Sequence, residues 1–127
     1  MRFSAATRAV GREAMRERHR LGRMATPALR ARFPGLQSLQ VGFDFSDRGE
    51  FRPSPQLTAF HPPAPAYFRF ACPYSDCDGE FDLTDAVKLA VDSGDARSGG
   101  QVRCVGTRHR VVACTLCAEY SITPYRL

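Results

Sequence analysis

The chain has 127 residues, of which 43% are hydrophobic and 24% charged, and this is the size and balance of one ordinary globular domain. No stretch approaches the roughly 20 apolar residues that a membrane-spanning helix needs. The Arg-rich N-terminus is not followed by the apolar segment of a secretory signal. We therefore expect a cytoplasmic protein with no membrane partner.

The formal net charge of +5 is concentrated at one end of the chain. Residues 24–127 hold 11 basic and 11 acidic residues and are neutral overall. A neutral globular part offers little long-range attraction for a phosphate backbone. The excess positive charge lies in residues 1–23, which hold two acidic residues, Glu13 and Glu17. The same segment holds seven arginines: Arg2, Arg8, Arg12, Arg16, Arg18, Arg20 and Arg23.

Residues 1–23 are therefore separated as a basic N-terminal arm, and residues 24–127 are expected to form a single domain. The arm has three interpretations: it is disordered, it is helical, or it is a start-site artefact, because Met24 is an alternative first residue. If it is real, it either contacts RNA or an acidic surface, or it is simply a solvated helix.

The first predicted elements are strands. Residues 37–45 alternate, with Leu39, Val41, Phe43 and Phe45 on one face, which is the period of a half-buried strand. A polar connection leads to a short strand at 56–60. The prolines of 61–66 lack backbone donors and predict a stiff surface link. An aromatic, alternating strand follows at 66–72.

The period then changes to that of a helix. Leu83, Val87, Ala90 and Val91 fall at i, i+4, i+7 and i+8, with Asp82 or Thr84 as the N-cap and Gly94 at the end. A flexible loop is expected at 92–100. Strand-like segments follow at 101–105, 110–114 and 118–125. The order of strands, helix and strands predicts a small antiparallel α+β domain with one helix.

Five cysteines carry the clearest chemical signal, at positions 72, 77, 104, 114 and 117. Cys72 and Cys77 form one close pair, and Cys114 and Cys117 form another. Such spacing lets two thiolates converge on one tetrahedral ion, and two strand-flanked pairs are typical of a zinc ribbon. Disulfides are disfavoured by the odd number of cysteines and the lack of secretory context.

The fourth ligand has two candidates besides Cys72, Cys77 and Cys114. Cys117 has the simple CxxC spacing, but it is out of phase with the apolar residues around it. Cys104 is followed two residues later by glycine, as Cys77 is. We favour Cys104 and keep Cys117 as the competing ligand, otherwise a surface thiol.

The segments FRFACPYSDCDGEFDL, RCVG and CTLCAEYSI resemble a group of small, uncharacterised bacterial zinc-ribbon proteins. That group pairs a CPxxxCxGxFDL knuckle with a later CxG and a terminal Cys-x-Leu, and the similarity covers about residues 37–125. The matching positions are Cys72, Cys77, Cys104 and Cys114, and a cysteine at 117 is a departure. The resemblance implies a zinc-ribbon fold and a metal, but no activity.

A zinc ion with four thiolate ligands is coordinatively closed, so it cannot activate a water molecule and is expected to be structural. The chain has three histidines, and no His-x-Glu precedes the cysteines, which disfavours a zinc deaminase. A redox dithiol at Cys114 and Cys117 would need a helix N-terminus, whereas a strand is predicted there. We therefore expect no enzymatic activity, with thiol redox activity as the open alternative.

The predicted function is that of an adaptor that contacts a protein partner, in a transcription or translation assembly. The alternative is a nucleic-acid-binding ribbon that uses the N-terminal arm together with Arg103, Arg108 and Arg110. Acidic residues also cluster beside the first cysteine pair and form either a docking face or solvated charge near a helix N-terminus; they are Asp76, Asp78, Glu80, Asp82 and Asp85.

Overall fold

The structure is a computed structural model that describes residues 5–49, 52–109 and 111–127. Arg110, one of the arginines considered above for nucleic-acid binding, lies outside the described residues. The elements are α1 (Ala5–Ala25), α2 (Leu29–Arg32), β1 (Leu36–Ser46), β2 (Gln56–Phe60), β3 (Arg69–Ala71), β4 (Glu80–Asp82), α3 (Thr84–Ser93), β5 (Ser98–Arg103), β6 (Thr107–Arg108), β7 (Val112–Ala113) and β8 (Cys117–Arg126).

The described strands form three antiparallel sheets: a four-stranded sheet in the order β2-β1-β8-β5 and two hairpins, β3-β4 and β6-β7. The predicted α+β class is confirmed. The described part of the chain holds three helices, whereas the sequence predicted one, α3, and left a helix within residues 1–23 as an alternative. Two of them lie before the first strand.

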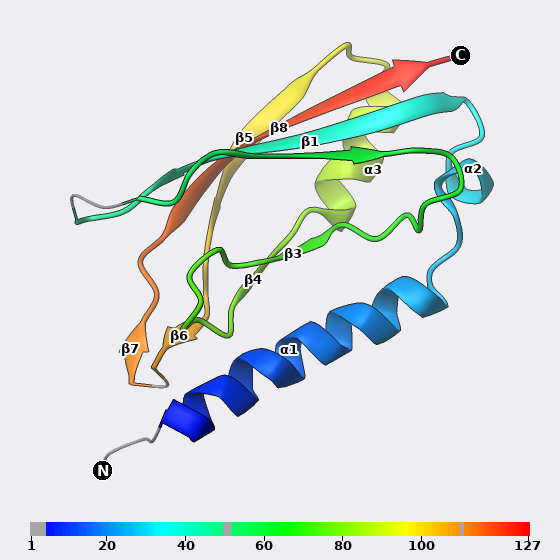
Figure 1. Cartoon of the computed structure of the whole chain (residues 1–127). Coiled ribbons are helices and arrows are strands. Elements are labelled where there is room, and N and C mark those ends of the chain that lie inside the picture. Colours follow the sequence, from blue (N-terminus) through cyan, green and yellow to red (C-terminus); the bar gives the residue numbers. More distant parts are fainter. Residues whose placement is uncertain (1–4, 50–51, 110) are drawn as a thin grey trace.

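The long strands β1 and β8 form the centre of the main sheet and pair along almost their whole length (Figure 1). The alternation seen in residues 37–45 has the expected consequence, because Leu39, Val41, Phe43 and Phe45 are all buried on one face. The strand at 56–60 is also confirmed. The strand expected over residues 66–72 is only three residues long, because only Arg69–Ala71 pair with β4.

Helix α3 begins one residue away from the predicted caps, since its N-cap is Leu83. The Asp82 carboxylate nevertheless accepts a hydrogen bond from the backbone N–H of Thr84 at 3.0 Å. Gly94 ends the helix with φ 78°, as predicted. The expected loop at 92–100 is shorter than predicted, because Ser98 and the two glycines after it already pair with β8.

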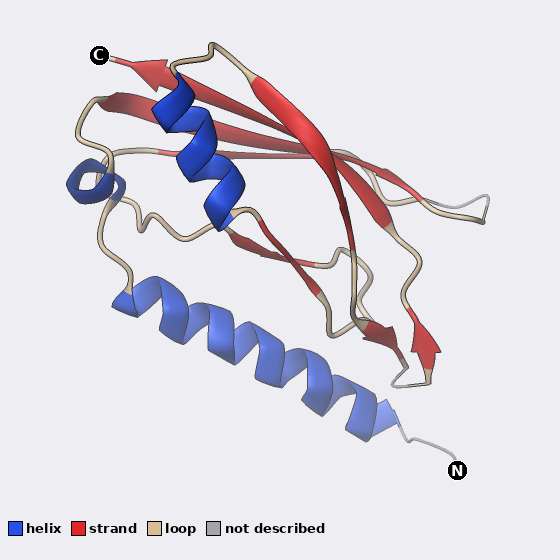
Figure 2. Cartoon of the chain, turned by 180° about the vertical axis from the view of Figure 1, so that it is seen from behind, coloured by secondary structure: helices blue, strands red, loops and turns tan. Residues whose placement is uncertain are grey.

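The core lies between the main sheet and a second layer that contains α3 and the β3–β4 hairpin (Figure 2). Aromatic rings fill this space. Phe81 of the hairpin lies 5.7 Å from Phe43 and 6.2 Å from Phe45, measured between ring centroids. Phe68 packs against Phe60 of β2 at 5.0 Å. These contacts fix the hairpin, and with it the first cysteine pair, beneath the sheet.

Helix α1 lies along the other side of the hairpin and forms a third layer (Figures 1 and 2). Its buried stripe is made by Gly11, Met15 and His19, which follow one another at helical spacing. His19 contacts the carboxylate of Glu80 in β4. Residues of the basic segment are thus part of the packed structure.

No described helix is long and apolar enough to cross a membrane.

Met15 offers a direct test of this packing, because it is fully buried while Met24 in the same helix is 72% exposed. We expect Met15→Ala to lower the free energy of unfolding by about 2–5 kcal/mol, since it removes buried methylenes and leaves a cavity. Met24→Ala should change it by less than about 0.5 kcal/mol. Urea titration measures both values, and equal effects of the two changes would contradict the docked position of α1.

Candidate metal centre

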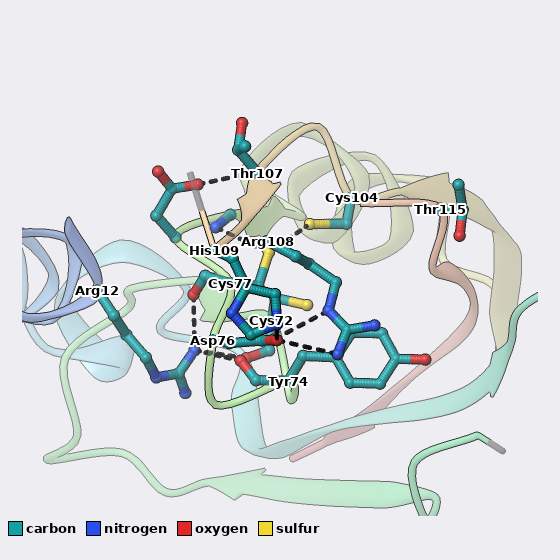
Figure 3. A network of polar contacts seen from close by, with 12 residues as sticks. Arg12, Cys72, Tyr74, Asp76, Cys77, Cys104, Thr107, Arg108, His109 and Thr115 are labelled. Atoms are coloured by element: carbon teal, nitrogen blue, oxygen red, sulfur yellow. Dashed lines mark hydrogen bonds and ion pairs between the residues drawn. The ribbon is translucent and has the colours of Figure 1, made fainter. Parts of the chain in front are cut away.

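Four cysteines from separate segments of the chain meet at one end of the molecule. Cys72 and Cys77 lie in the loop between β3 and β4, Cys104 directly follows β5, and Cys114 directly follows β7. All four are buried, and their sulfur atoms lie within 4.8 Å of one another. Figure 3 shows the side chains of Cys72, Cys77 and Cys104 pointing toward one another.

The spacing of these sulfurs suits a metal ion. Two sulfurs bound 2.3 Å from a common tetrahedral centre lie about 3.8 Å apart, and the Sγ atoms of Cys77 and Cys104 are 3.6 Å apart. A disulfide would require about 2.05 Å. All five cysteines are free thiols. The four grouped cysteines could therefore hold a metal ion.

Cys117 lies outside this group. It is half-buried at the first residue of β8, and its sulfur lies 3.9 Å from the backbone oxygen of Thr115. The residues that the structure brings together are thus Cys72, Cys77, Cys104 and Cys114, which is the set that the sequence analysis favoured. The CxxC spacing of Cys114 and Cys117 does not make them neighbours at the site, because the chain is already extending into β8.

Two of the cysteine turns have the same local geometry. The backbone N–H of Gly79 donates to the sulfur of Cys77 at 3.3 Å, and that of Gly106 donates to the sulfur of Cys104 at 3.4 Å. Such hydrogen bonds favour the thiolate. Backbone groups of Tyr74 and Leu116 act in the same direction on Cys72 and Cys114, but other contacts and burial outweigh them, and the pKa of both thiols is raised overall.

The thiols also influence one another strongly. Hydrogen bonds from the sulfurs of Cys104 and Cys72 lower the pKa of Cys77, so one thiolate is stable in the cluster. Hydrogen bonds with the sulfurs of Cys104 and Cys77, together with burial, raise the pKa of Cys72, so this thiol keeps its proton beside the charged neighbour. Burial likewise raises the pKa of Cys114. A divalent cation at the centre would remove this opposition and let all four thiolates form.

Gly79 and Gly106 pack back to back between the two halves of the site. A Cβ on Gly106 would collide with the Cα and N atoms of Gly79 and lie 3.0 Å from the sulfur of Cys77. A Cβ on Gly79 would collide with the sulfur of Cys104. The glycine two residues after each cysteine is therefore needed so that the two loops can approach closely enough to share one centre.

Polar side chains also join the Cys72–Cys77 loop to the β6–β7 hairpin. Arg108 of β6 pairs with both carboxylate oxygens of Asp76, at 2.9 and 3.1 Å, and stacks over the ring of Tyr74 at 4.0 Å (Figure 3). Asp78 accepts a hydrogen bond from the backbone N–H of Thr107 at 2.8 Å. Burial alone would raise the pKa of Asp76, but hydrogen bonding to Arg108 and its charge lower it overall. Both acidic residues thus serve to join the cysteine loops.

Asp47, just beyond β1, joins the same loops from the side of the main sheet. Its carboxylate accepts hydrogen bonds from the hydroxyl groups of Tyr74, at 2.6 Å, and Thr115. The bonds from Thr115 and Tyr74 lower the pKa of Asp47. The stabilisation that they provide is present above the unfolded-state pKa and is lost as the pH falls through the lower, folded-state pKa.

Arg12 of α1 contacts the first cysteine loop directly. Its Nη1 atom donates hydrogen bonds to the backbone oxygens of Cys72, Tyr74 and Cys77, at 3.0, 2.8 and 2.9 Å. Three carbonyls from one loop converge on one guanidinium (Figure 3). This contact holds the loop in its turn and brings a positive charge beside a site that carries negative charge when its thiols ionise.

Sequence analysis missed Arg12 and Asp47 as residues of the site. Both lie far from the cysteines along the chain, and nothing in their local sequence distinguishes them from other charged residues. Arg12 was one of seven arginines in the arm, and Asp47 belonged to a polar connection. The helical spacing of Gly11, Met15 and His19 was a usable signal that one face of the arm is buried.

Comparisons with protein-family models, curated protein sequences and solved structures find no match for this chain.

The contact between the two glycines gives a sharp test of the site. We expect Gly106→Ala to separate the two loops and lower the free energy of unfolding by about 3 kcal/mol. Gly35→Ala is the matched control, because a Cβ there has nothing within 4 Å. Chemical denaturation measures both, and metal content measured on the same samples should fall for the first variant alone. A normal metal content in Gly106→Ala would contradict the close approach.

Proposed function

We propose that the four-cysteine centre holds a single structural zinc ion and that the protein is a non-catalytic adaptor. The observation that carries the first part is the set of four buried sulfurs within 4.8 Å of one another. Tetrahedral sites made only of thiolates select zinc or iron. The two Cys-x-Gly turns with N–H···S hydrogen bonds, and the resemblance of the cysteine pattern to bacterial zinc-ribbon proteins, favour zinc.

The absence of catalysis follows from the coordination that we propose. A zinc ion that binds four thiolates has no open position for a water molecule or a substrate. A redox dithiol at Cys114 and Cys117 is disfavoured, because Cys114 belongs to the buried group and Cys117 opens a strand. Thiol reactivity of this kind needs a helix N-terminus or a nearby cation to stabilise the thiolate.

The proposed contact with a protein partner is supported by the surface next to the metal centre. Three valines around the β6–β7 hairpin are exposed: Val105 by 88%, Val111 by 64% and Val112 by 58%. Exposed apolar side chains gathered in one segment are typical of contact surfaces between proteins. We propose that this segment, which we term the valine tip, docks on an apolar patch of a protein in a transcription or translation assembly.

Nucleic-acid binding through Arg103, Arg108 and Arg110 has weaker support. Arg108 is engaged by Asp76 and by the ring of Tyr74, so its guanidinium is less available for a phosphate. Arg103 is exposed at the end of β5.

Free thiols at all five cysteines suit a reducing compartment, and we propose the cytoplasm.

Zinc binding is tested by comparing two cysteine variants. We expect the full chain purified from zinc-supplemented cells to contain zinc, Cys104→Ser to lose most of it, and Cys117→Ser to keep it. The reason is that Cys104 belongs to the buried group and Cys117 does not. Elemental analysis measures the metal. Iron in place of zinc, or equal loss in both variants, would contradict the proposal.

The valine tip is tested by capture of partners from nuclease-treated lysate. We expect Val112→Asp to abolish capture of a protein that the wild type retains, because a buried carboxylate at an apolar contact is costly. Leu89→Asp is the matched control, since Leu89 is 71% exposed on α3. Quantitative mass spectrometry compares the bound proteins. Partners that are lost equally from both variants, or only after nuclease treatment, would argue against a docking role for the tip.

A further inference from the structure

A second surface lies on the side of α1, beyond the proposed function. An open groove with a volume of about 840 Å³ lies between helix α1 and strand β3. Four arginines of α1 line it, and Arg69 of β3 faces them. The acidic residues in its lining are Glu13 and Glu17, so the formal charge of the groove is +3. The arginines from α1 are Arg12, Arg16, Arg20 and Arg23.

The spacing of these arginines aligns them along one side of the helix. Positions three or four apart lie on the same side of an α-helix, about 4.5–6 Å apart along its axis. Because residues 24–127 are neutral overall, this row concentrates the positive charge of the protein at one groove. A row of cations at regular intervals suits a polymer with regularly spaced anions.

The arginines differ in how far they are already engaged. Arg12 is bound to the cysteine loop, and Arg20 pairs with Glu17 at 2.9 Å on the surface. Arg69 makes only long contacts, 3.6 Å to Glu80 and 3.4 Å to Asp82.

Among the described residues, no carboxylate lies within ion-pair distance of Arg16 or Arg23. Arg16 and Arg23 are both exposed. Arg23 lies over the ring of Tyr67, 6.0 Å from its centroid, but this contact does not pair it with a carboxylate. Arg16 and Arg23 are therefore the cations that are most available to a ligand in the groove.

The chemistry of the lining favours phosphate as the anion. The guanidinium group presents a planar fork of donors that matches the oxygens of a phosphate. Phe70 also lines the groove; its half-buried ring packs edge-on against Phe43 at 5.1 Å between centroids and leaves part of its surface in the lining. An aromatic surface within a basic groove suits unpaired bases. We propose that the groove between α1 and β3 binds single-stranded nucleic acid through its phosphates, with Arg16 and Arg23 as the principal contacts.

The groove exists only while α1 is docked, because α1 forms one of its walls. Arg12 ties that wall to the backbone of the cysteine loop, and Cys72 and Pro73 line the end of the groove nearest the metal centre. The groove is therefore tested on the folded full chain, in which α1 is docked.

Fluorescence anisotropy with a labelled oligouridylate of about 12 nucleotides tests this proposal on the metal-loaded full chain. We expect Arg16→Ala/Arg23→Ala to weaken binding by at least about tenfold. We also expect the slope of log K against log salt to become shallower by about 1.4, because two phosphate contacts are lost. Unchanged zinc content and circular dichroism would show that the variant is folded.

The matched control is Arg30→Ala/Arg97→Ala, which removes the same net charge at exposed positions outside the groove. We expect its affinity and salt slope to remain close to those of the wild type. An equal loss in both double variants would show that only overall charge matters and would overturn the proposal.

Two further results would also overturn it. One is the absence of binding by the wild type at low salt. The other is equal competition by polyglutamate of matched charge, which would indicate an acidic protein as the partner. The oligonucleotide assay tests Arg16 and Arg23 and does not depend on the valine tip. Its results are therefore independent of the capture experiment.

Discussion

The convergence of four thiols on one small volume is the constraint on which the rest of this structure depends. The thiols come from the β3–β4 loop and from the two segments that flank the β6–β7 hairpin, and the back-to-back contact of Gly79 and Gly106 allows these segments to meet. Among bare thiols, one negative charge opposes the next, so the cluster is fully ionised only around a cation. A metal ion would therefore join the β3–β4 hairpin to the β6–β7 hairpin, each of which is too short to be stable alone.

The contacts around the centre extend this constraint to the rest of the fold. Asp47 connects both cysteine loops to the end of β1, and Arg12 connects the first loop to α1. The N-terminal helix is thus held partly by the loop that carries two of the four grouped cysteines. The two surfaces proposed for binding lie on either side of this arrangement, the valine tip on one cysteine loop and the arginine groove beneath the other.

Local patterns predicted most of the individual elements, because each depends on neighbours along the chain. The alternation of 37–45 and the helical spacing from Leu83 to Val91 arise from burial of one face, and both elements formed as expected. The Cys-x-Gly repeat indicated Cys104 in preference to Cys117, because the glycine is needed within the same turn. Cap positions and strand ends were less accurate, since they depend on pairing with distant strands.

The sequence by itself thus determined the class of fold, the central strand and the helix after the first cysteine pair, and it reduced the choice of a fourth cysteine to Cys104 or Cys117. Only the tertiary structure decided the strand order β2-β1-β8-β5 and the packing of α1 on the β3–β4 hairpin. It also decided the roles of Arg12 and Asp47 beside the cysteine loops. The physical reason is that hydrogen bonds and ion pairs between distant residues leave no periodic trace in the sequence, whereas burial of one face does.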